Sequence, residues 1–374
     1  MFHPPFCPNP ACENHHRPKR SRWYQKRGQY LTTTFGSIPR FQCKSCRRGF
    51  SSQTFSLDYY AKRRLNYHTI YNRINAGAGV RNIARDLKVK DAAITNRINR
   101  MARNAILANQ MILSTLPFKE DLVIDGLQNF CVSQFFPDNY TVVVGKTSQF
   151  IYDCDYATLR RGGRMTSTQR LRRAELEKRF RPPGRAVEHS FRRLLGMIRE
   201  RRKVEGPLIL YTDEKKDYQR GFWGKGGFEG ELFSGRWRHH MTNSKMGRNQ
   251  ANPLFPVNYV DREIRKDMAS QARETVQFPR NASNAMLKMA LYCFDHNLRK
   301  PYRIGDREKR KLRHAQAAGL ERWVIDRVLS DFFERRFFHR GEWRLSESAR
   351  MSLERRWVTP LKRGPEVLQK YMAA

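Results

Sequence analysis

The chain has 374 residues, 39% of them hydrophobic, and its 73 Lys and Arg against 35 Asp and Glu give a formal net charge of +38. This length and apolar content allow two or three domains with at least one sizeable core. No apolar run approaches the ~20 residues that a membrane-spanning helix needs, and the N-terminal "MFHPPFCPNP" lacks the charged and apolar regions of an export signal.

The excess of positive charge predicts a polyanionic partner. Such a charge repels itself in a compact fold unless an anion offsets it, so DNA or RNA is expected before an anionic membrane surface. Without an export signal, the expected compartment is a reducing cytoplasm. There, paired cysteines are more typical of metal ligands than of disulfides.

Four of the seven cysteines occur as two close pairs, Cys7-x4-Cys12 and Cys43-x2-Cys46. Each pair lies in a tight turn, where two thiolates can point at one centre, and structural zinc takes four such ligands in a tetrahedron. The alternating segment between the pairs indicates two strands. The sequence therefore predicts a zinc ribbon over residues 1–56, with unpaired structural thiols as the alternative.

Residues 59–112 have a helical pattern with the spacing of a helix-turn-helix, in which "AGAG" marks a break and "DLKVKDAAI" leads into a further helix. On that helix Ile94, Ile98 and Met101 are expected to face inward. Six polar or basic residues are expected to face outward and contact base edges and phosphates: Thr95, Asn96, Arg97, Asn99, Arg100 and Arg103. The alternative is an ordinary helical hairpin with a solvated basic face.

Two aspartates stand at the ends of apolar, strand-like segments: Asp125 follows "EDLVI" and Asp213 follows "GPLILYT". A carboxylate in such a place is costly unless a positive group meets it. Two such strands can present their acids side by side to Mg²⁺. Two ions ~4 Å apart would then promote phosphoryl transfer, an arrangement completed by a third carboxylate.

Between these strands and the next helix lie two further segments. Residues 160–203 are strongly basic and largely helical, which suits contacts with phosphates. Residues 219–256 have weak periodicity, which predicts an inserted loop. Its Trp223 and Trp237 are expected either to stack on DNA or to form an aromatic mini-core.

The stretch "NYVDREIRKD" carries three candidates for the third carboxylate. One apolar stripe runs along a predicted helix over residues 257–268: Val257, Val260, Ile264 and Met268. At about 100° per residue, Asp261 lies about 60° from the centre of this stripe and Glu263 about 100°. Asp261 is therefore expected to reach a site on the sheet, and Glu263, the second choice, to point toward solvent. Asp267 is a lesser candidate, and the alternative is that all three are surface charges.

The order of these features resembles that of bacterial insertion-sequence transposases with an N-terminal zinc ribbon. The resemblance covers roughly residues 5–303 and rests on "CPNPAC…CKSC" and "NYVDREIRKDMASQARETVQFPRNASN". It implies an RNase H-like catalytic domain with a DDE or DDD acid set. By this likeness Asp125 and Asp213 match the first two acids, and Asp261 matches the third.

The expected fold is a multidomain α+β or α/β chain. Its expected parts are a zinc ribbon, a helix-turn-helix domain, an RNase H-like mixed-sheet core with an insertion, and a basic helical C-terminal region, over residues 1–56, 59–112, 117–303 (insertion 219–256) and 304–374.

The expected function is that of a transposase that binds terminal inverted repeats and catalyses strand cleavage and strand transfer. The resemblance implies structural Zn²⁺, two catalytic Mg²⁺ or Mn²⁺ ions, double-stranded DNA at the element ends and target, and a homodimer on DNA. No membrane partner is expected, and the expected location is the bacterial cytoplasm, on the nucleoid. The alternative is a transposase-derived DNA-binding regulator that lacks catalytic activity.

Overall fold

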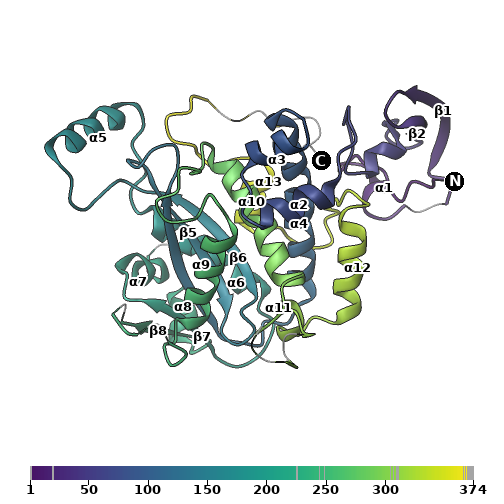
Figure 1. Ribbon diagram of the computed structural model, residues 1–374. Helices are drawn as coiled ribbons and strands as arrows, with labels where there is room; N and C mark the ends of the chain where they lie inside the picture. The colour runs from purple at the N-terminus through teal and green to yellow at the C-terminus, as the bar shows by residue number, and fades with distance from the viewer. Residues whose placement is uncertain are drawn as a thin grey trace.

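The computed structural model describes most of the chain, namely residues 2–18, 21–224, 226–243, 245–247, 249–303, 305, 307–308, 311–364, 366 and 368. Figure 1 shows a small N-terminal β unit at one end, a group of helices in the middle and a larger sheet at the other end. In the described residues, no helix is both long and apolar enough to cross a membrane.

The N-terminal unit (residues 2–18 and 21–56) is a small antiparallel sheet. Its strands follow the order β1-β2-β3, with a short helix before them and a 3₁₀ turn after them: α1 (Glu13–His16), β1 (Tyr24–Thr32), β2 (Gly36–Cys43), β3 (Gly49–Ser51) and η1 (Ser52–Phe55). Its core is made of cysteines and aromatic rings, among them Phe6, Trp23 and Phe41. So small a core gives little stability by itself and needs a further constraint.

The central helices pack around one long helix. They come from both halves of the chain: α2 (Tyr67–Asn75), α3 (Val80–Asp86), α4 (Asp91–Thr115), α10 (Ala282–Leu298), α11 (His314–Ala317), α12 (Arg322–Phe332) and α13 (Glu347–Leu353). Helix α4 has 25 residues, and from Arg97 to Ala108 every residue except Arg103 is buried. It contacts α2, α3, α10, α12 and α13, so it is a core helix rather than a surface one.

The larger sheet is mixed and has five strands in the order β6-β5-β4-β7-β8. Its strands are β4 (Leu122–Phe130), β5 (Pro137–Gly145), β6 (Ile151–Thr158), β7 (Leu208–Asp213) and β8 (Trp237–Thr242). The first three form an antiparallel meander, whereas β7 runs parallel to β4 and β8 runs parallel to β7.

Side chains on β4 alternate between two apolar clusters on opposite faces of this sheet. Leu122 and Ile124 join the cluster that contains α6 (Ala186–Arg201). Val123 and Leu127 join the cluster that contains α9 (Phe255–Asp267). The sheet is therefore covered on both faces, and α9 defines the face on which the candidate acids are sought.

The segment 219–256, expected to be an inserted loop, instead adds to the sheet. It holds most of α7 (Lys216–Phe222), all of α8 (Glu229–Phe233), and the edge strand β8, which pairs with β7 from Leu208 to Asp213. The sequence of β8, "WRHHMT", is too polar to be recognised as a strand. An edge strand needs little apolar alternation, so its sequence pattern is weak. Trp237 is buried and stacks on Phe228, whereas Trp223 is half exposed.

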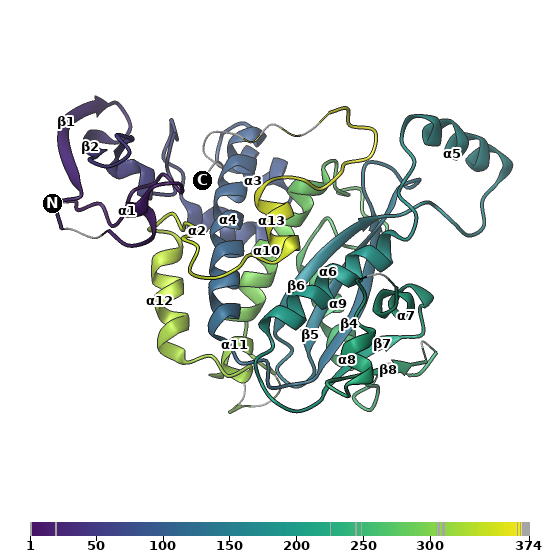
Figure 2. The ribbon, with the colours of Figure 1, turned by 180° about the vertical axis from the view of Figure 1, so that it is seen from behind.

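The basic stretch 160–203 divides into two parts with different surroundings. Helix α5 (Ser167–Arg179) projects away from the sheet, as Figures 1 and 2 both show. Helix α6 lies against the sheet, and its Arg193 forms a 2.6 Å ion pair with the fully buried Asp155. Only part of this basic stretch is therefore presented to an outside polyanion.

Candidate metal centres

The four N-terminal cysteines meet at one point. Their sulfur atoms all lie within 4.8 Å of one another, with Cys7 Sγ 3.6 Å from Cys46 Sγ and Cys12 Sγ 3.7 Å from Cys43 Sγ. A tetrahedron with Zn–S bonds of about 2.3 Å has edges of about 3.8 Å. The predicted convergence is confirmed, and the cluster could hold a structural metal such as zinc.

Local turns bring each cysteine pair together. The Cys12 N–H donates to the Asn9 carbonyl at 3.0 Å, and the Cys43 N–H donates to the Arg48 carbonyl at 3.0 Å. Arg47 has a φ of 61°, the left-handed conformation that closes a tight turn. These contacts lie within a few residues of each pair, so the geometry is encoded locally.

The thiols of the cluster differ in acidity. Burial raises the pKa of Cys7. Burial also acts to raise the pKa of Cys46, but hydrogen bonds from the Arg48 backbone and the Asn9 side chain lower it to about 7. Cys46 is thus more ready than Cys7 to lose its proton to an incoming metal.

The N-terminal unit is attached to a distant segment of the chain. The Phe6 ring lies 5.2 Å from the Phe338 ring, centre to centre. The Arg336 N–H donates to the Phe55 carbonyl at 2.8 Å. Residues near position 338 therefore complete the small aromatic core of the unit.

Asp125 and Asp213 lie on neighbouring parallel strands. Val123 on β4 is opposite Tyr211 on β7, and each aspartate stands two residues further along its own strand. Residues two apart share a face of a sheet, and Val123 and Tyr211 belong to the apolar cluster of α9. Both carboxylates therefore start from the face that α9 covers. Both are half-buried.

Helix α9, which bears Asp261, packs on β4 and β5. The Arg265 guanidinium donates to the Gln128 carbonyl at 3.0 Å, which fixes the end of α9 against β4. Asp261 lies one helical turn before Arg265, and Asp125 lies three residues before Gln128. Lys146 follows Gly145, which pairs with Leu122 at the start of β4, and it lines one pocket together with Phe255 at the start of α9. Helix α9 and β4 therefore run in the same direction, and both aspartates lie on the same side of the Arg265 contact.

The charges of all three aspartates act on the hydroxyl of Tyr218. Burial, and then the negative charges of Asp125, Asp213 and Asp261, raise its pKa well above the usual value. The hydroxyl is buried and finds no hydrogen-bond partner among the described residues. Tyr218 was not predicted from the sequence, because the polar run "DEKKDY" gives no sign that its last residue is buried beside the acids.

The aspartates are nevertheless less tightly gathered than the cysteines. Among the described residues, the cysteine cluster is the only group of three or more His, Cys, Asp or Glu side chains with ligand atoms close enough to share an ion. Three like charges facing one tyrosine repel one another. A cation would be needed to draw their oxygens closer.

Glu263 does not point toward solvent, so that expectation is wrong. It is 8% exposed, and its carboxylate lies 2.5 Å from the Lys266 ammonium and 3.9 Å from the Lys300 ammonium. Lys300 also pairs with Asp267. Lys300, just beyond α10, covers a side of α9 outside the predicted stripe, and its charge offsets both acids.

The expected outward orientation of the α4 residues is also wrong in part. Arg97, Asn99 and Arg100 are each about 5% exposed. The Arg97 and Arg100 guanidiniums each donate to a backbone carbonyl at 2.5 Å. The cause is long-range packing, since segments from both ends of the chain cover the face that the local pattern leaves open.

The other three α4 residues are half-buried. The Asn96 carbonyl oxygen accepts from Arg97 and Arg100, and Arg103 donates to the Leu353 carbonyl at 2.5 Å. Thr95 lines a cavity beside α3. That these residues contact DNA stays a prediction.

Comparison of the sequence with protein-family models and with curated proteins finds no match. The cysteine cluster and the mixed sheet are therefore the observations on which a function has to be argued.

Proposed function

We propose that the chain is a DNA transposase whose sheet is an RNase H-like catalytic core. The observation that carries the proposal is the placement of Asp125 and Asp213 on adjacent parallel strands, beneath the helix that bears Asp261. The strand order β6-β5-β4-β7-β8, with three antiparallel strands followed by two parallel ones, supports it.

The donor set suits a hard divalent cation. Carboxylate oxygens are the ligands that Mg²⁺ and Mn²⁺ prefer, and Asp125, Asp213 and Asp261 would hold the ions. Bound ions would activate an attacking oxygen and stabilise the leaving oxygen in phosphoryl transfer. The three carboxylates would position the ions.

The remaining features fit a DNA substrate. The net charge of +38 attracts a polyanion, and the projecting helix α5 offers several arginines to it. The cysteine cluster would hold zinc and keep the N-terminal unit folded for binding of the element ends.

The test is a cleavage and strand-transfer assay with the purified chain and DNA from the flanks of its reading frame. Products should require Mg²⁺ or Mn²⁺. Asp125→Asn and Asp213→Asn should each reduce product formation by more than about 100-fold. Asp326→Asn, at a half-exposed carboxylate on α12, is the matched control and should retain activity. Full cleavage by either active-site variant would contradict the proposal.

One observation favours a second candidate, a transposase-derived DNA-binding regulator without catalysis. The three aspartates do not approach within ion-sharing distance among the described residues. In that case the chain would bind the flanking DNA but yield no products with either metal.

A further inference from the structure

A cavity of about 830 Å³ lies between α3, the start of α4, the segment 268–281 and the start of α10. It is separate from both candidate metal centres. Its volume falls within the ~300–1,000 Å³ of pockets that hold small ligands.

Four cations line this cavity: Arg81, Arg85, Arg280 and Lys288. In the part of the chain that the structure describes, none of the four takes part in an ion pair. The only acid in the lining is Asp91. Positive charges gathered in this way repel one another unless an anion enters. Lys288 is half-buried, and its burial lowers the pKa of its ammonium.

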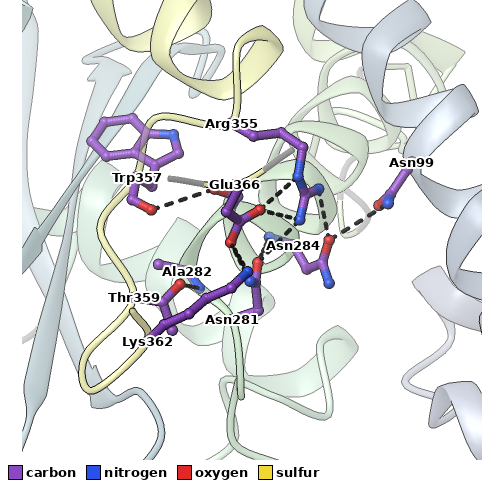
Figure 3. A network of polar contacts seen from close by, with 10 residues as sticks. Asn99, Asn281, Ala282, Asn284, Arg355, Trp357, Thr359, Lys362 and Glu366 are labelled. Atoms are coloured by element: carbon purple, nitrogen blue, oxygen red, sulfur yellow. Dashed lines mark hydrogen bonds and ion pairs between the residues drawn. The ribbon is translucent and has the colours of Figure 1, made fainter. Parts of the chain in front are cut away.

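One wall of the cavity presents amide groups in a fixed arrangement. Asn99 on α4 and Asn284 on α10 both line it, and their side chains are 3.5 Å apart. Figure 3 shows how Asn284 is held by Arg355, which is in turn paired with Glu366. This Arg355–Glu366 ion pair is half-buried, with an N–O distance of 2.5 Å. Amides positioned by such a support can form directed hydrogen bonds with base edges.

An aromatic ring and a guanidinium form a platform at another wall. The Arg280 guanidinium lies 4.4 Å from the centre of the Phe278 ring, and that ring lies 4.7 Å from the Phe130 ring. Phe130 ends β4, five residues and so about 17 Å along the strand from Asp125. Rings and arginines of this kind stack on unpaired bases.

We propose that this cavity, here the α3–α10 groove, binds a single-stranded segment of nucleic acid. Arg81, Arg85 and Lys288 contact its phosphates, and the platform and amides contact its bases. A cavity of about 830 Å³ equals a cube about 9 Å on a side, which is too narrow to enclose a duplex, because one groove of a duplex alone is ~12 Å wide. The inference rests on the proposed function only in naming DNA as the strand.

The experiment measures binding of the full chain by fluorescence anisotropy, without added Mg²⁺ or Mn²⁺. The probes are a labelled 12-nucleotide single strand and a hairpin duplex that contains the same sequence. Arg85→Gln and Lys288→Met should each weaken single-strand binding about tenfold, with a salt slope smaller by about 0.7. Binding of the duplex should change less than about threefold.

Two further variants separate the causes. Phe278→Leu should weaken single-strand binding about tenfold without changing the salt slope, because it removes stacking and keeps the charge. Arg327→Gln, an exposed cation on α12, is the control for net charge and should alter neither probe by more than about twofold. Thermal unfolding confirms that each variant is folded.

The proposal is overturned if the groove variants leave single-strand binding unchanged, or if they weaken binding of the single strand and of the duplex to the same extent. Its failure is distinguishable from failure of the proposed function, because this assay contains no catalytic metal and alters none of the three aspartates.

Discussion

The cysteine cluster and the aspartate site are both groups of acidic ligands, but they are assembled in different ways. The cysteines are brought together by turns a few residues long and lie at ion-sharing distance. The aspartates come from three elements far apart in sequence, are brought to one side of the sheet only by the packing of α9, and do not lie at ion-sharing distance among the described residues. The cysteine cluster is therefore expected to stabilise its unit, whereas the like charges of the aspartates are expected to destabilise the fold.

The largest expected effect concerns the cysteines. Cys43→Ser, or removal of the metal with a chelator, should unfold residues 2–56 while the larger sheet stays folded, because structural zinc contributes about 10–16 kcal/mol to a small domain. Hydrogen exchange measured by mass spectrometry would show full exchange in that region alone. Cys293→Ala, at a buried cysteine outside the cluster, should leave the N-terminal unit protected. If the N-terminal unit of Cys43→Ser stayed protected from hydrogen exchange, the cysteine cluster would not be the site that stabilises this unit.

The second largest effect concerns the dependence of stability on pH. It comes from two acids that are buried in the larger sheet, away from the cysteine cluster. Burial raises the pKa of both Asp138 and Asp153 to about 7. Between about pH 4 and pH 7 the folded protein keeps protons that the unfolded chain loses, so stability falls as pH rises through this range. Asp138→Asn should recover a few kcal/mol at pH 8 and reduce the slope. Denaturant titrations at pH 5 and pH 8 measure it. If Asp138→Asn changed the free energy of unfolding by the same amount at pH 5 and pH 8, the raised pKa of Asp138 would be contradicted.

Substitution of Asp213 is expected to stabilise the fold, whereas substitution of a cysteine in the cluster is expected to destabilise it. Asp213→Asn keeps an oxygen to accept from the Lys215 N–H and removes one of three like charges. In the absence of divalent ions, we expect the free energy of unfolding of Asp213→Asn to be about 1–2 kcal/mol larger than that of the unchanged chain, and its Tm to be higher by a few degrees. Calorimetry tests this, and a lower Tm would mean that this carboxylate stabilises the fold.

The smallest effect is expected at Glu263. Glu263→Gln removes ion pairs with two lysines, one of them mostly exposed, and should cost below about 1 kcal/mol. Cleavage should persist in this variant and be lost in Asp261→Asn. The reverse result would move the third ligand from Asp261 to Glu263.

These cases show what the sequence could predict. The cysteine cluster was predictable because its geometry depends on local turns. Asp125 and Asp213 were identifiable because each ends an apolar strand segment. The burial of Glu263 and Arg97, the edge strand β8 and the burial of Tyr218 near the acids were not, because each depends on at least one residue 29 or more positions away.

The contact between the N-terminal unit and Phe338 has a consequence for synthesis of the chain. The cysteines emerge first, yet the ring that completes their aromatic core is made almost 300 residues later. At about 5–20 residues per second, this delay is roughly 15–60 s. Throughout that time, a metal ion captured by the cysteines would be the principal means of keeping the unit folded until the last part of the chain is made.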